Sequence, residues 1–352
     1  MDTPLLNRLQ RLSSSIPGVL ILKRQLRQNT TACGMTYWLS TIGERLGFKV
    51  LTYHRILEQA NPYYSHCIPA PLFEAQARMF SRFCAVLSLD EIVARLERGQ
   101  DLPRRCIALT FDDGYRDTAT LAAPILARYQ LPATVYVAVD AVERGTLWPD
   151  LLRYALRQTI AHSLELDTLR DGGTQRFDLS TPKERVTTVY RLGARMKRLP
   201  NAQRLQVVQE VSAKLLGTVP ERVAHGPAPM LSWDDIRSLQ RQGITIGAHT
   251  ISHPILSRMS EHDAWHEIMA SRQILQQKLG VNIRHFAYPN GQAEDFSPTI
   301  MDMVEQAGFV TAVTTVHGVN QPGEDRMALK RIDGTMVSLR ALVSALVEHD
   351  VQ

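Results

Sequence analysis

The chain has 352 residues, of which 44% are apolar, so it can bury a sizeable core in one or two domains. Its net charge of +5 suits a solvated basic surface or attraction to anionic lipid or glycan, but no basic-aromatic module or zinc-knuckle spacing points to nucleic acid. The four cysteines are scattered and predict free thiols in a reducing compartment. No apolar run approaches a membrane span of ~20 residues and no signal peptide is recognisable. We therefore expect a cytoplasmic protein that at most contacts the inner face of the membrane.

Residues 1–47 read as a basic helical appendage, and from Lys49 onward strand-like and helix-like patterns alternate. Expected strands are Val50–Tyr53, Ile107–Phe111, Ala133–Val139, Ile244–Ala248, Ile283–Ala287 and Val310–Thr315. Expected helices are Pro71–Phe83, Ser88–Arg98, Asp117–Tyr129, Ser260–Gly280, Pro298–Ala307 and Leu339–Glu348. This alternation predicts an α/β fold with a parallel sheet or barrel over residues 48–352.

The segment Trp148–Pro229 interrupts the alternation. Its pattern is mostly helical, and Arg176–Leu179 is its single candidate strand. The helices expected there are Leu151–Thr159, Pro182–Arg198 and Ala202–Leu216. We therefore predict a helical insertion over about residues 148–229.

Two adjacent carboxylates, Asp112 and Asp113, directly follow the apolar strand Ile107–Phe111 and precede Gly114. A sharp turn at this point would place both acids at the carboxyl end of the strand. Neighbouring carboxylates in a concave site repel each other unless a metal or a proton compensates them. The pair therefore predicts a metal or acid–base site.

Two histidines four residues apart, His249 and His253, follow the strand Ile244–Ala248. On a helical turn or a tight loop they can face one centre. With Asp113 they would form a three-ligand site that leaves positions open for water and substrate. Zn²⁺ fits this set, and Fe²⁺, Co²⁺ or Ni²⁺ would fit it as well.

The reactive residues share one position in the fold, because each cluster follows a predicted strand. His54 follows Val50–Tyr53, and Tyr288-Pro289-Asn290-Gly291 follows Ile283–Ala287. In a parallel barrel the carboxyl ends of the strands open on one face. These segments, with the aspartates and histidines, are therefore expected to line one cleft.

Thr110-Phe111-Asp112-Asp113-Gly114-Tyr115 and His249-Thr250-Ile251-Ser252-His253-Pro254 resemble the signature motifs of the polysaccharide deacetylases with a NodB homology domain, carbohydrate esterase family four. The resemblance runs from about Lys49 to Arg331, interrupted by the insertion. It implies a distorted (β/α) barrel and metal-dependent removal of acetyl groups from N-acetylated sugars.

The resemblance also implies roles for individual residues. Asp112 corresponds to the catalytic base, and Asp113, His249 and His253 correspond to the metal ligands, with Zn²⁺ the expected metal. Phe286–Gly291 resembles the third motif and Leu231–Asp235 the fourth, which form walls of the groove. Expected substrate-binding residues are Tyr115, Tyr288, Pro289, Asn290, Gly291 and Trp233.

The chain departs from the family pattern at two places. Ala287 stands where many members carry an arginine that orients the base, and Arg331 is the candidate replacement. The C-terminal histidine that serves many members as the acid has only His317 as its counterpart, in a poorly matching context. The poly-N-acetylglucosamine deacetylases have permuted motifs with the acid in a sequence like Thr52-Tyr53-His54-Arg55, so we favour His54 over His317.

The leading expectation is a metal-dependent hydrolase that removes the N-acetyl group from an N-acetylhexosamine unit of a polysaccharide or lipid-linked saccharide. One alternative is a deformylase or another C–N hydrolase acting on an amino sugar. Another is a catalytically silent glycan-binding protein. The intact set of Asp112 and three metal ligands argues against the silent protein, because an uncompensated cluster of charges is costly to keep.

Overall fold

The computed structural model describes residues 30–38, 47–59, 61–167, 174–217 and 229–347. Within these residues, seven parallel strands form a closed ring. Pairing of the first strand, Phe48–Tyr53, with both Cys106–Phe111 and Leu329–Asp333 closes it. In order around the ring the strands are β1 (Phe48–Tyr53), β5 (Cys106–Phe111), β6 (Thr134–Val137), β9 (Thr245–Ala248), β10 (His285–Ala287), β11 (Thr311–His317) and β12 (Leu329–Asp333). The expected (β/α) barrel is confirmed.

The barrel strands are short and apolar because both of their faces are covered. Every residue of β1 and β5 is buried, which is typical of parallel strands with side chains inside the barrel and helices outside it. The covering helices are α3 (Ala70–Phe83), α4 (Leu89–Glu97), α5 (Ala123–Tyr129), α6 (Val139–Arg144), α10 (Trp233–Arg241), α11 (Glu261–Leu279), α12 (Pro298–Gln306) and α13 (Leu339–Val347). A π-helical turn, η1 (Thr118–Ala122), leads into α5.

Several helix ends follow from single side chains. Ser88 accepts a hydrogen bond from the backbone N–H of Glu91, and Ser260 accepts one from that of Asp263. Ser232 and Asp235 form a reciprocal capping box at the start of α10. Gly280 ends α11 in the left-handed conformation that glycine adopts without steric cost.

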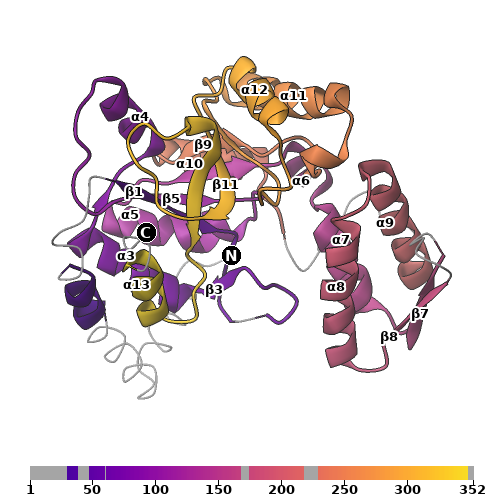
Figure 1. Cartoon of the computed structure of the whole chain (residues 1–352). Helices are drawn as coiled ribbons and strands as arrows, with labels where there is room; N and C mark the ends of the chain where they lie inside the picture. Colours follow the sequence, from indigo (N-terminus) through magenta and orange to yellow (C-terminus); the bar gives the residue numbers. More distant parts are fainter. Residues whose placement is uncertain (1–29, 39–46, 60, 168–173, 218–228, 348–352) are drawn as a thin grey trace.

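The insertion forms a separate lobe beside the barrel (Figure 1). It has its own apolar core. Its helices are α7 (Trp148–Gln158), α8 (Pro182–Met196) and α9 (Asn201–Leu216), and its hairpin pairs β7 (Ser163–Leu166) with β8 (Gln175–Asp178). The three helices were predicted. Of the hairpin, only β8 matches an expected strand, and β7 was missed because its Ser-Leu-Glu-Leu sequence is too short to show a period.

The last barrel strand, β12, was also missed as a strand. Lys330, Arg331 and Asp333 make its sequence look like a polar surface segment. The Arg331 side chain nevertheless points into the barrel and is fully buried. The expected strand Ala133–Val139 is shorter than predicted, because the chain turns at Ala138 and α6 begins at Val139.

The remaining elements are small. They are β2 (Arg55–Leu57) paired with β3 (Cys67–Pro69), β4 (Ala85–Val86) beside β5, and the 3₁₀ turns η2 (Leu256–Arg258) and η3 (Arg326–Ala328).

Of the expected N-terminal appendage, residues 30–38 are helical and most of the rest lies outside the described residues. All four cysteines are free thiols. In the described part of the chain, no helix is both long and apolar enough to span a bilayer.

Two glycines provide a test of barrel packing. A Cβ added at Gly247 in β9 would lie 2.5 Å from the ring of Tyr136 and 2.9 Å from the carbonyl oxygen of His285. Gly193 in α8 has open space around it. We predict that Gly247→Ala lowers the free energy of unfolding by about 1–3 kcal/mol through overpacking, whereas Gly193→Ala raises it by about 0.5–1 kcal/mol through helix propensity. Urea unfolding measures both, and equal effects would contradict the packing described for β9.

Candidate active site

The carboxyl ends of the barrel strands surround a cavity of about 750 Å³. The residues that line it there include His54 after β1, Asp112 and Asp113 after β5, His249 after β9, Asn290 after β10 and Arg331 in β12. The expectation that these distant segments line one cleft is confirmed. The insertion adds part of the wall through Pro149, Arg153, Ala194, Lys197 and Arg198.

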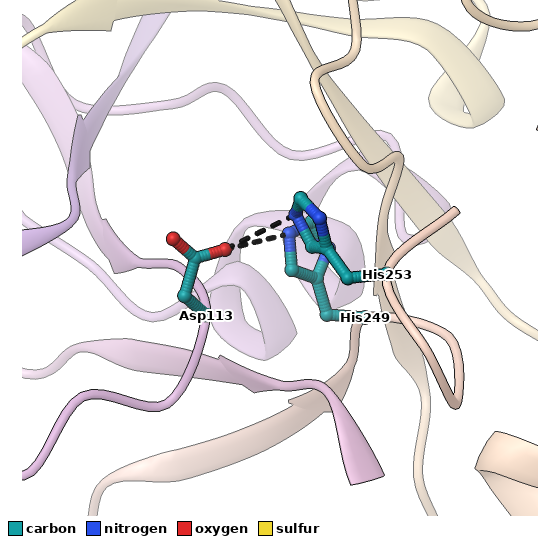
Figure 2. Close-up of side chains that lie close together, drawn as sticks. All are labelled: Asp113, His249 and His253. Carbon is teal, nitrogen blue, oxygen red and sulfur yellow. Dashed lines mark ion pairs between the residues drawn. The ribbon is translucent and has the colours of Figure 1, made fainter. Parts of the chain in front are cut away.

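Three side chains in this cavity converge on one point. Figure 2 shows the carboxylate of Asp113 facing the rings of His249 and His253. Its Oδ1 atom lies 3.4 Å from Nε2 of His249 and 3.2 Å from Nε2 of His253. All three residues are buried, and their potential ligand atoms lie within 4.8 Å of one another.

The backbone adopts unfavourable conformations to present these groups. Asp113, Thr250 and His253 have φ values of 73°, 66° and 56°, in the left-handed region that costs a non-glycine residue about 1–3 kcal/mol. His249 and His253 lie on a tight loop rather than on a helical turn. The carboxylate of Glu267 holds this loop by accepting hydrogen bonds from the backbone N–H groups of Ile251 and Ser252, at 2.7 and 2.9 Å.

The donor atoms fit a divalent cation. Nδ1 of His249 lies 2.7 Å from the carbonyl oxygen of Ala287, so it carries the proton and leaves Nε2 free as a ligand. Oδ1 of Asp113 is buried and accepts no hydrogen bond from any described residue. Lone pairs that face one another across this gap favour a positive charge between them.

Asp112 has a different partner. Arg331 binds it with both ends of the guanidinium: Nη1 donates to Oδ1 at 2.8 Å and Nη2 to Oδ2 at 2.6 Å. Nε of Arg331 donates to the carbonyl oxygen of Thr314 at 2.5 Å, and this third hydrogen bond fixes the plane of the guanidinium. Burial raises the pKa of Asp112, but the charge and hydrogen bonds of Arg331 outweigh it, so the pKa is lowered and the group stays ionised. Arg331 therefore makes the contact with Asp112 that the resemblance led us to expect from an arginine at position 287.

The two histidines considered as the acid both line the cavity. Nε2 of His54 lies 3.9 Å from Oδ2 of Asp112, and its side chain is 22% exposed. His317, at the end of β11, is exposed. Burial lowers the pKa of His54, and the charges of Asp113 and Asp112 partly offset this.

The expected substrate-binding residues divide into two groups. Tyr115 and Asn290 line the cavity, whereas Tyr288, Pro289, Gly291 and Trp233 do not. The hydroxyl of Tyr288 donates to the carbonyl oxygen of Met327, and its ring stacks on Phe296 behind the cavity wall. The indole of Trp233 donates to Glu143 at 2.9 Å, outside the cavity. These four residues were predicted to bind substrate, but they do not line the cavity, because a sequence motif locates a segment near the groove without fixing which side chains face it.

A buried network around Tyr115 was not anticipated from the sequence. Its hydroxyl donates to Asp150 in α7 at 2.9 Å, and Asp150 pairs with Arg153 at 3.0 Å. The guanidinium of Arg55 lies over the rings of Tyr64 and Tyr115. Arg55 could have been expected near the site, because it directly follows His54 in the sequence. No sequence spacing links Asp150 to Tyr115.

The ligand geometry predicts one tight divalent metal site per chain. His249→Ala and His253→Ala should each abolish stoichiometric Zn²⁺ binding, because two ligands no longer close the site. His262 and His266 provide a matched control, since they are also four residues apart but lie outside the cluster, on α11. Metal content after dialysis measures the result. Loss of metal in the His262→Ala/His266→Ala variant, or its retention in His249→Ala, would contradict the assignment.

The two-pronged pairing predicts that Arg331 cannot be replaced by another cation. Arg331→Lys keeps the charge but loses the two parallel hydrogen bonds of the guanidinium. Asp112 should then be displaced, and kcat should fall by about 100-fold. Arg331→Met leaves Asp112 buried without a partner and should cost about 3–5 kcal/mol of stability. Arg326→Lys, which alters the exposed pair with Glu97, is the control and should change neither. Full activity of Arg331→Lys would show that the paired hydrogen bonds from Arg331 to Asp112 are dispensable.

Comparisons with known proteins agree with this geometry. The family model described as polysaccharide deacetylase matches residues 99–312, more than half of the chain. None of the curated protein sequences is significantly similar to the chain.

Solved structures show the same fold at low identity. The Streptococcus pyogenes deacetylase PplD, in complex with acetate, is 18% identical with a TM-score of 0.57, over 85% of this chain and 97% of that one. IcaB from Ammonifex degensii is 19% identical with a TM-score of 0.55, over 86% and 98%. A de-N-acetylase from Aggregatibacter actinomycetemcomitans is 17% identical with a TM-score of 0.52, over 84% and 98%. With the family match, the barrel and the site motifs in agreement, the chain belongs to the polysaccharide deacetylase family and is a hydrolase that acts on N-acetylated sugars.

Proposed function

We propose that the protein removes the acetyl group from N-acetylhexosamine units of a glycan, with a divalent metal bound by Asp113, His249 and His253. One observation carries the proposal: an ionised carboxylate locked by Arg331 lies next to a separate three-ligand cluster in the same cavity. Family membership supports the substrate class, and the de-N-acetylase among the similar structures supports the type of bond that is cleaved.

Zn²⁺ is the metal we propose, because two imidazole nitrogens and one carboxylate oxygen with open positions form its usual catalytic site. Co²⁺, Ni²⁺ or Fe²⁺ would bind the same atoms. When bound, the cation polarises the amide carbonyl and lowers the pKa of water at the site. Asp113, His249 and His253 hold it, and the hydrogen bond from His249 to Ala287 keeps that ring in the ligating tautomer.

The remaining residues divide the proton transfers between them. Asp112 accepts the proton of the attacking water, since Arg331 keeps it ionised and oriented. The backbone N–H of Tyr115, beside Asp113 on the cavity wall, donates to the oxyanion that develops on the substrate. His54 donates a proton to the departing amine, which leaves poorly unless protonated.

The glycan itself is proposed from its chemistry only. A polymer or a lipid-linked saccharide with N-acetylated hexosamines is the substrate class that we propose. A cytoplasmic location stays a prediction from the scattered cysteines and the unrecognised signal peptide. Contact with the inner face of a membrane stays a prediction from the basic N-terminal sequence.

Acetate release from N-acetylglucosamine oligomers tests the proposal. The metal-loaded protein should release acetate, and Asp112→Asn should lower kcat by about 100-fold or more while Zn²⁺ content stays at one per chain. Asp302→Asn, at an exposed position on α12 outside the cavity, is the matched control and should keep wild-type activity. Near-wild-type turnover by Asp112→Asn would show that another group is the base.

A second comparison tests the acid. His54→Gln should lower kcat by about 100-fold, because the amine must then leave without a positioned proton donor. His317→Gln should reduce kcat far less. Substrates with an activated leaving group need no acid, so such a substrate should restore turnover of His54→Gln. The opposite ranking of the two variants would assign the role to His317.

A further inference from the structure

The first turn of α7 contacts both loops that carry the candidate metal ligands. The indole N–H of Trp148 donates to the carbonyl oxygen of His253 at 3.2 Å. Two residues later, Asp150 accepts a hydrogen bond from the hydroxyl of Tyr115 at 2.9 Å. Tyr115 is two residues beyond Asp113 in the chain. The insertion therefore bridges the loop after β5 and the loop after β9.

Both contacts are shielded from water. Trp148, Tyr115 and Asp150 are 7%, 3% and 2% exposed. A buried N–H or O–H that loses its partner suffers the full cost of desolvation, so these hydrogen bonds are directional constraints. Pro149, between the two bridging residues, lines the cavity.

Each end of the bridge is braced from within the insertion. The guanidinium of Arg204, in α9, lies 4.9 Å from the ring centre of Trp148, and this arginine is only 1% exposed. Arg153 donates to Asp150 at 3.0 Å. Its guanidinium also lies 4.8 Å from the ring centre of Tyr64. Neither Trp148 nor Asp150 can turn away without breaking a second contact.

His253 depends on its hydrogen bond from Trp148, because its ring has less support of its own than the ring of His249. The ring of His249 is oriented through Nδ1 by the carbonyl oxygen of Ala287. Nδ1 of His253 is buried and has no hydrogen-bond partner among the described residues. Its position is set through its backbone, by Thr250 Oγ1 at the N–H and by Trp148 at the carbonyl oxygen. The backbone is also left-handed there, with φ of 56°, so it needs external support.

We propose that the first turn of α7 is a clamp that sets the spacing between Asp113 and His253 and thereby the affinity for the metal. Trp148 and Tyr115 are positioning residues in this clamp, one on each loop. The inference rests on the proposed metal-dependent function. It assigns the insertion a role in the metal centre in addition to forming a wall of the cavity.

A double-mutant cycle on Zn²⁺ affinity tests the clamp. Trp148→Phe removes the indole N–H and Tyr115→Phe removes the hydroxyl, while both keep an aromatic ring. The dissociation constant of Zn²⁺ is measured by competition with a chelator, and the melting temperature of each metal-free variant reports on folding. Each single variant should bind Zn²⁺ about tenfold more weakly, in the range found for outer-shell partners of metal ligands. Because a clamp needs both ends, the double variant should bind no more weakly than the weaker single variant.

The control is Trp233→Phe, which loses an indole hydrogen bond to Glu143 outside the cavity and should keep wild-type affinity. Wild-type affinity in both single variants would overturn the clamp and leave the proposed function intact. Losses that multiply in the double variant would also overturn it, since the two contacts would then act independently. Should Trp148→Phe fail to fold, Tyr115→Phe alone decides: unchanged affinity refutes the clamp. A wild-type protein that binds no Zn²⁺ would refute both this inference and the proposed function.

Discussion

Two adjacent buried carboxylates impose the main physical constraint on this protein. Asp112 and Asp113 are next to each other in the chain, and both are nearly inaccessible to water. Two ionised carboxylates on adjacent buried residues repel each other. The pKa of at least one of them would rise unless each carboxylate has a compensating partner of its own. The structure gives each carboxylate its own surroundings: Arg331 pairs with Asp112, and Asp113 forms a candidate cation site with the two histidines. The left-handed backbone at Asp113 supports this division by changing the direction of the chain between the two side chains.

Closure of the barrel brings these partners together. Arg331 lies 219 residues from Asp112 along the chain and reaches it because β12 pairs with β1, which in turn pairs with β5. The histidines come from β9 on the other side of β6. Strand pairing that closes the ring therefore also assembles the proposed acid–base and metal-binding groups. Steric constraints inside the barrel, such as the packing of Gly247 against Tyr136, act on the same elements that position the site.

The sequence predicted those parts of the structure that depend on local pattern. Apolar runs gave the strands that precede the site, and the spacing of His249 and His253 gave the ligand set. β12 was missed because Lys330, Arg331 and Asp333 are charged, and only the ion pair with Asp112 makes a buried arginine favourable there. Trp233 was expected at the groove on its motif alone, but its indole bonds to Glu143 outside the cavity. The contacts of Trp148 and Asp150 with the two ligand loops depend on how the insertion packs, which no local spacing encodes.

The division of the two carboxylates can be observed directly in crystals of the Zn²⁺-loaded protein, with anomalous diffraction at the zinc edge. The account predicts one zinc ion about 2.0–2.2 Å from Oδ1 of Asp113 and from Nε2 of His249 and His253. Asp112 should remain paired with Arg331 and outside the ligand set. Zinc bound by Asp112, or an Arg331 released from Asp112 when the metal binds, would contradict the account.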